Sequence, residues 1–216
     1  MDVSFLLNQY FKGDDNVTID VFDAITLNDI YSRVMTVLTS HLNIELSVLQ
    51  SLSYCFYEIL DNVHIHSGKP LGTAITHYDD GKGVLKVLVA DDGMGICESL
   101  RQNPIYSTIS EEQALSACLN DSVTDGKGMG FGLFATLKLI QSIGIRFILY
   151  SGSHKLIISN GKTSVQANGL WHGTIVYLEV STNVDFDPQN IVMNRTDVAS
   201  EYNEQFIDTE ELSQLW

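Results

Sequence analysis

Three short blocks in a fixed order constrain this chain more than any other feature of its sequence. The first block is EILDNVHIH, from Glu58 to His66; the second is DDGMG, from Asp91 to Gly95; and the third is GMGFGL, from Gly128 to Leu133. Each block alone is weak evidence. Together they supply a polar helix face, an acid beside two glycines, and a glycine-rich entry to a helix.

The first block predicts one face of a helix. Apolar residues recur at helical spacing and are expected to face a core: Leu49, Leu52, Phe56, Leu60 and Val63. Glu58, Asn62 and His66 are successive i,i+4 positions, so they form a stripe about 12 Å long.

This stripe carries three different polar groups. Asn62 can offer its side-chain oxygen to Mg²⁺, Glu58 can orient or deprotonate a nucleophile, and His66 can donate a hydrogen bond to a phosphate. The alternative is the solvated polar face of an amphipathic helix.

The second block follows a predicted strand over residues 84–90. A carboxylate at the end of a buried strand, Asp91, can accept a hydrogen bond from an exocyclic amine such as that of adenine. Gly93 and Gly95 allow positive φ and close approach of the backbone to a flat ligand. The alternative is an ordinary Asp-Gly turn, and we expect Asp92 to be a solvated turn acid.

The third block precedes an apolar helical run, residues 133–143, that ends at Gly144. Glycines at a helix N-terminus leave N–H groups free for an anion, and Lys127 adds a cation. The alternative is a flexible loop. A P-loop is excluded, because Leu156 stands where the pattern around Gly161-Lys-Thr163 needs its first glycine. A Rossmann fingerprint is also excluded, because no βαβ unit places an acid at the required distance.

The three blocks resemble the motifs of the GHKL ATP-binding superfamily, which includes gyrase, a heat-shock chaperone, histidine kinases and a mismatch-repair protein. The resemblance covers about residues 47–180. It assigns Glu58, Asn62 and His66 to the N box, Asp91, Gly93 and Gly95 to the G1 box, and Gly128, Gly130, Gly132 and Leu133 to the G2 box.

The resemblance also implies the ligands of the site. Asn62 would hold Mg²⁺, Asp91 would bind the adenine amine of ATP, and the glycines of the third block would surround the phosphates. Thr174 matches the threonine that the family carries on its last strand, near the adenine. The family places a mobile lid between the second and third blocks, here residues 97–127, and this segment contains a capping-box pattern, Ser110 to Gln113, before a short helix at 114–119.

The order of elements predicts an α+β fold, a two-layer α/β sandwich of Bergerat type. Its sheet is mixed and mostly antiparallel, with helices on one face. Strands are expected at 17–22, 84–90, 146–151, 154–159, 163–167 and 173–180, and a helix at 27–39. We divide the chain into an N-terminal strand and helix (1–46), the ATP-binding domain (47–180) and an acidic tail (181–216).

Composition limits the partners. The chain has 27 acids against 12 bases and a formal net charge of −15, so nucleic acid is not an expected partner. No apolar run is long enough for a membrane span, and three scattered cysteines fit a reducing cytoplasm. The tail is expected to be solvated.

The resemblance is strongest to one-domain regulators such as the anti-sigma-factor serine kinases, because there is no room for a dimerisation hairpin that carries a phosphorylated histidine. His41 is expected to be a surface residue. The leading hypothesis is a Mg-dependent ATP-binding regulator that phosphorylates a partner protein. The alternatives are a slow ATPase switch and an interaction module whose nucleotide site is structural. The acceptor, the partner and the oligomeric state, a homodimer among the options, remain open.

Overall fold

The fold of the chain is α+β in a computed structural model that describes residues 1–41, 46–118, 120, 123–126 and 145–182. The helices are α1 (Val3–Tyr10), α2 (Leu27–His41), α3 (Leu46–His66), α4 (Gly95–Leu100), η1 (Pro104–Tyr106) and α5 (Glu111–Ala117). The strands are β1 (Thr18–Phe22), β2 (Gly72–Asp79), β3 (Val84–Ala90), β4 (Arg146–Ser159) and β5 (Lys162–Ser181).

The described strands form one sheet in the order β1-β2-β3-β5-β4, and every neighbouring pair is antiparallel. Alternation along β3 decides which face each residue serves. Leu85, Val87 and Val89 pack with α2 and α3 in the main core, whereas Leu88 and Ala90 belong to a second cluster on the opposite face. The predicted two-layer α/β sandwich is confirmed, and all five apolar positions predicted for the inner face of α3 are buried.

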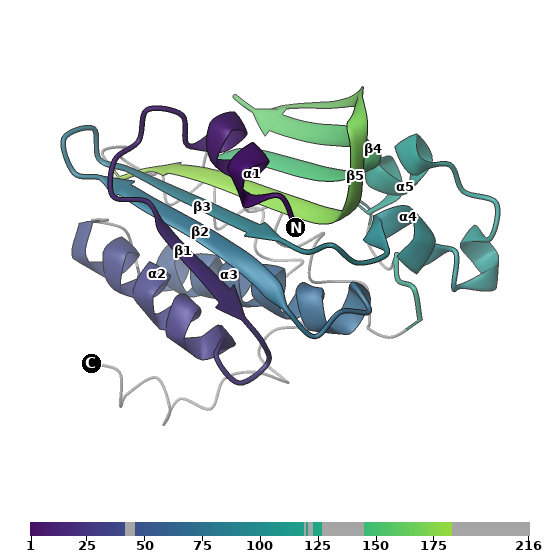
Figure 1. The fold of residues 1–216 in the computed structure, drawn as a ribbon, viewed down its shortest axis with the longest axis horizontal. Helices are drawn as coiled ribbons and strands as arrows, with labels where there is room; N and C mark the ends of the chain where they lie inside the picture. The colour runs from purple at the N-terminus through teal and green to yellow at the C-terminus, as the bar shows by residue number, and fades with distance from the viewer. Residues whose placement is uncertain (42–45, 119, 121–122, 127–144, 183–216) are drawn as a thin grey trace.

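Helix α1 covers part of the second face of the sheet and was missing from the sequence prediction. It lies on one side of the sheet, with α2 and α3 on the other (Figure 1). The side chain of Asp2 caps its N-terminus by accepting a hydrogen bond from Phe5 N, and Leu6 is fully buried against the sheet together with Phe11. Eight residues are too few for a strong helical pattern, so this helix depends on the sheet for its stability.

Strands β4 and β5 are longer than the sequence indicated. The four segments predicted between residues 146 and 180 join into one long hairpin, with register shifts at Ser151/Gly152 and Gly152/His154. Such irregularities bend a strand and increase its twist without ending it. Gly152 breaks the alternation of apolar residues, and for this reason the pattern indicated two strands instead of one bent strand.

The segment predicted as a lid, residues 97–127, contains most of α4, together with η1 and α5. Ser110 and Gln113 form the predicted capping box at the start of α5. Ala114 and Leu115 of α5 are buried in the protein interior, so this part of the segment is anchored to the domain. In the described part of the chain, no helix is both long and apolar enough to cross a membrane.

The packing of α1 makes a direct prediction. Replacing the fully buried Leu6 by alanine removes apolar contacts with the second face of the sheet and should lower the free energy of unfolding by about 2–5 kcal/mol. Gln9→Ala, at an exposed position of the same helix, should change it by less than about 0.5 kcal/mol. Urea denaturation measures both; equal stabilities of the two variants would show that α1 does not pack as described.

Candidate functional site

Asp91 lies at the end of β3, beside β5. Its backbone N–H donates to Thr174 O (2.9 Å), and Trp171 Nε1 donates to Asp91 O (3.2 Å). Gly93 N donates to Asp91 Oδ1 (2.8 Å), which fixes the carboxylate in the turn. The acid of the second block and the threonine on β5 are therefore neighbours.

Burial changes the acidity of this carboxyl group. Asp91 is only 4% exposed, and desolvation raises its pKa from 3.8 to about 6, against the opposing effect of N–H groups from Gly93 and Thr174.

The glycines of this turn are required by contacts within the protein. A Cβ at Gly93 would lie 2.2 Å from Ser67 O, and a Cβ at Gly95, where φ is +75°, would lie 2.6 Å from Ser151 Oγ. The structure therefore gives a reason for these glycines that differs from the predicted close approach of a flat ligand, which stays a prediction. The turn must fit between the end of α3 and the hairpin of β4 and β5.

On β5, facing the Asp91 turn, Gly173 must also be a glycine. Gly173 has φ of +100°, and a Cβ there would lie 2.2 Å from Asp91 O. Ser151 Oγ donates to Gly173 O (2.9 Å) and accepts from Ile96 N (2.9 Å). One serine thus links β4, β5 and the first turn of α4, an arrangement that no sequence motif had indicated.

The stripe of α3 approaches the same turn. Glu58, Asn62 and His66 are all partly buried, and Ser67, the next residue after the helix, accepts a hydrogen bond from Met94 N (3.0 Å). The end of α3, where His66 lies, and the Asp91 turn are therefore in direct contact through this backbone hydrogen bond.

The surroundings of Glu58 change the acidity of its carboxyl group. Burial raises its pKa, with a smaller opposing effect from a hydrogen bond to Tyr54; Asp61 raises it further and His66 lowers it. Raised pKa values of this kind are common at catalytic carboxyl groups.

His66 has a partner that sequence analysis missed. Its Nδ1 lies 2.8 Å from Asp125 Oδ2, and Ser99 Oγ donates to the same oxygen (2.7 Å). Ser99 and Asp125 lie far from His66 in the sequence and match no motif, so only the fold could reveal this contact.

Other predicted residues are not tested by this geometry. Lys127, Gly128, Gly130, Gly132 and Leu133 lie outside the described residues. Within the described ranges, no cluster of three or more His, Cys, Asp or Glu side chains could hold a metal. Asn62 is a single amide, and Mg²⁺ commonly keeps several waters and binds substrate phosphates, so the magnesium prediction stays a prediction.

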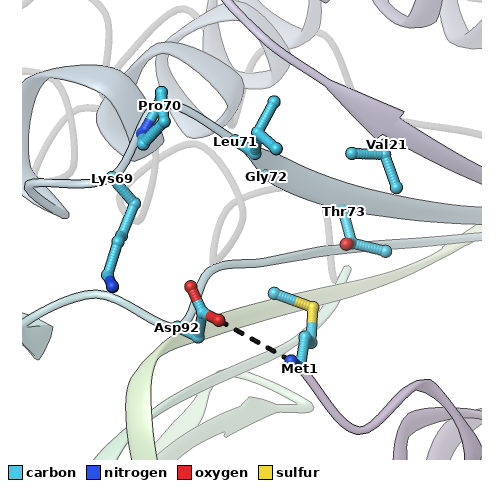
Figure 2. Close-up of a pocket in the computed structure, with 8 residues that line it drawn as sticks. All are labelled: Met1, Val21, Lys69, Pro70, Leu71, Gly72, Thr73 and Asp92. Carbon is cyan, nitrogen blue, oxygen red and sulfur yellow. Dashed lines mark ion pairs between the residues drawn. The ribbon is translucent and has the colours of Figure 1, made fainter.

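Two hollows border the Asp91 turn. One, of about 400 Å³, is lined by Met94, Glu98, Arg101 and Gln102. The other, of about 250 Å³, lies between the start of β2, β1 and the turn, as Figure 2 shows; its lining consists of Met1, Val21, Lys69, Pro70, Leu71, Gly72, Thr73 and Asp92. Asp92 is half exposed, as expected of a turn acid, but it also forms an ion pair with the Met1 amine (3.6 Å).

Among known proteins, solved structures match this chain, whereas family models do not. No family model and no curated protein matches the chain. Among solved structures, one match is the histidine kinase domain from the Erythrobacter litoralis EL346 blue-light activated histidine kinase. The sequence identity is 14%, the TM-score is 0.35, and the alignment covers 79% of this chain and 65% of the kinase domain chain. This protein thus spans less than two thirds of the length of the kinase domain chain. A structural similarity at this TM-score says nothing about chemistry.

The raised pKa of Asp91 predicts a pH dependence of stability. Between about pH 4 and pH 6 the folded protein keeps a proton that the unfolded chain releases, so the free energy of unfolding should fall as pH rises through this window. In Asp91→Asn this decrease should be smaller by about 1–3 kcal/mol. Urea denaturation at several pH values measures it, with Asp92→Asn as the control at the half-exposed neighbour. An unchanged profile in Asp91→Asn would contradict the desolvation of Asp91.

The close approach at Gly173 can be separated from its backbone conformation. Gly161 also has positive φ (+70°), but a Cβ added there would meet no atom within 4 Å, so Gly161→Ala should cost only the conformational penalty, about 1 kcal/mol. Gly173→Ala adds a clash with Asp91 O and should cost about 3 kcal/mol or more. Thermal denaturation compares the two variants. Equal losses of stability would show that Gly173 is not tightly packed against Asp91.

Proposed function

We propose that this protein is a Mg-dependent, ATP-binding regulator that transfers the γ-phosphate of ATP to a partner protein. The observation that carries the proposal is the contact between two predicted parts of the site. Asp91, buried beside Thr174, and the polar stripe of α3 are joined through Ser67 and Met94.

Four of the predicted site residues have a chemical role in this proposal. The Asp91 carboxylate would accept a hydrogen bond from the exocyclic amine of adenine, with Thr174 beside it. Asn62 would contribute one oxygen ligand to Mg²⁺, which neutralises charge on the phosphates. Glu58, two helical turns before His66, would accept the proton of the attacking hydroxyl group.

The transfer itself requires positioning more than covalent participation by the protein. As the acceptor oxygen bonds to the γ-phosphorus, its proton passes to the Glu58 carboxylate, and the bond to the β-phosphate oxygen breaks to release ADP. Burial of Glu58 favours this role, because a carboxylate with a raised pKa is a stronger base.

A second candidate function is a slow ATPase switch, in which water replaces the protein hydroxyl as the acceptor. The same buried Glu58 would activate water, so the site geometry serves both reactions equally. The identity of the acceptor distinguishes them. We favour protein transfer because of the resemblance to one-domain serine kinases in the sequence motifs.

The fate of the γ-phosphate tests this proposal. With γ-labelled ATP and Mg²⁺, label should appear on a protein of a fractionated lysate, and Glu58→Gln should reduce its rate about 100-fold or more while ATP affinity changes little. Asn62→Ala should also lose transfer and its dependence on Mg²⁺ concentration.

Release of the label only as free phosphate would favour the switch. If ATP stays intact in every fraction although it binds, the site is a structural one and the interaction module is the correct function.

A further inference from the structure

The contact of His66 with Asp125 has no role yet in the proposed function. The inference drawn from it rests on that function. Asp125 is 1% exposed at its side chain, whereas His66 is 31% exposed. Asp125 Oδ2 accepts two hydrogen bonds, one from His66 Nδ1 and one from Ser99 Oγ. A buried carboxylate with two donors on one oxygen is a rigid support for the more exposed ring.

The chemistry of the contact sets the state of the imidazole. An ionised carboxylate can only accept, so Nδ1 carries a proton and donates it to Asp125. This hydrogen bond to Asp125 fixes the orientation of the ring, and Nε2 is the nitrogen left for a ligand. This arrangement, in which an acid holds one nitrogen and so aims the other, is common where a histidine serves a functional site.

The position of the ring suggests which ligand Nε2 meets. His66 follows Glu58 and Asn62 on the stripe of α3, and Ser67 contacts the Asp91 turn through Met94 N. Asp91 is the predicted adenine contact, and Asn62 the predicted ligand of the phosphate-bound cation. The ring is therefore on the side of the site where the phosphates would lie.

We propose that Asp125, supported by Ser99, is a positioning residue that holds the His66 imidazole with Nε2 directed at the phosphates of the nucleotide. With nucleotide bound, the ring would donate from Nδ1 to Asp125 and from Nε2 to a phosphate oxygen. Asp125 thereby connects the end of α3 with α4 and with the segment that precedes the third block.

Isothermal calorimetry with ATP and with adenosine, both with Mg²⁺, tests the role of Asp125. Asp125→Ala and His66→Ala should each weaken ATP binding about tenfold, and the double variant should be no weaker than His66→Ala, because both changes remove one interaction. Adenosine has no phosphate, so its affinity should be unchanged in all three variants.

Conservative variants keep the test decisive if Asp125→Ala does not fold. Asp125→Asn retains an oxygen that can accept from Nδ1 and should restore most of the affinity. Ser99→Ala should weaken ATP binding about threefold, whereas Ser116→Ala, an exposed hydroxyl group on α5 that donates to Glu112 O, should have no effect.

The outcomes separate this inference from the proposed function. ATP affinity unchanged in Asp125→Ala, or equal losses for ATP and adenosine, would overturn the positioning role and leave the proposed function intact. If the wild-type protein binds neither compound, the proposed function fails first and the inference with it.

A nitrogen-15 NMR spectrum of the side chains tests the tautomer without any nucleotide. The chain has six histidines, so comparison with His66→Gln assigns the ring. A proton on Nδ1 in the wild type, lost in Asp125→Ala, supports the contact. A neutral ring protonated at Nε2 in the wild type would overturn it.

Discussion

The site depends on one constraint, the burial of the Asp91 carboxylate at the end of a central strand. Its neighbours leave no space to spare. Gly173 approaches its carbonyl from β5, and Gly93 approaches Ser67 at the end of α3. Because both approaches exclude a Cβ, glycine is needed on either side of the acid. The raised pKa of Asp91 is the electrostatic result of the same packing.

Much of the fold could be predicted because its elements have strong local patterns. Strand β3 alternates between two apolar faces, and α3 repeats its apolar residues for five positions, all of them buried. Helix α1 could not be found in this way, because eight residues give little periodicity and their burial depends on the second face of the sheet. The bend in β4 and β5 was also missed, since Gly152 interrupts a pattern that the backbone continues.

In the candidate site too, residues with a local sequence pattern could be predicted and residues without one could not. Asp91, Thr174 and the α3 stripe were predicted from spacing and resemblance, and the structure places Asp91 beside Thr174 and the end of α3 beside the turn. Ser67, Ser151 and Asp125 were not identified, because each acts through a partner from a distant part of the sequence. Residues that shape a site by holding others in place have no motif of their own, and for this reason the fold is needed to find them.

Asp91 is proposed to recognise the exocyclic amine of adenine, and the choice between ATP and GTP tests this proposal. ATP and GTP differ at this point, because guanine presents a carbonyl oxygen where adenine presents an amine, and a carboxylate can accept only from the amine. Calorimetric titration of the wild-type protein with each nucleotide, in the presence of Mg²⁺, should show binding of ATP and at least about tenfold weaker binding of GTP. Equal affinities for ATP and GTP, or no binding of either, would contradict the account.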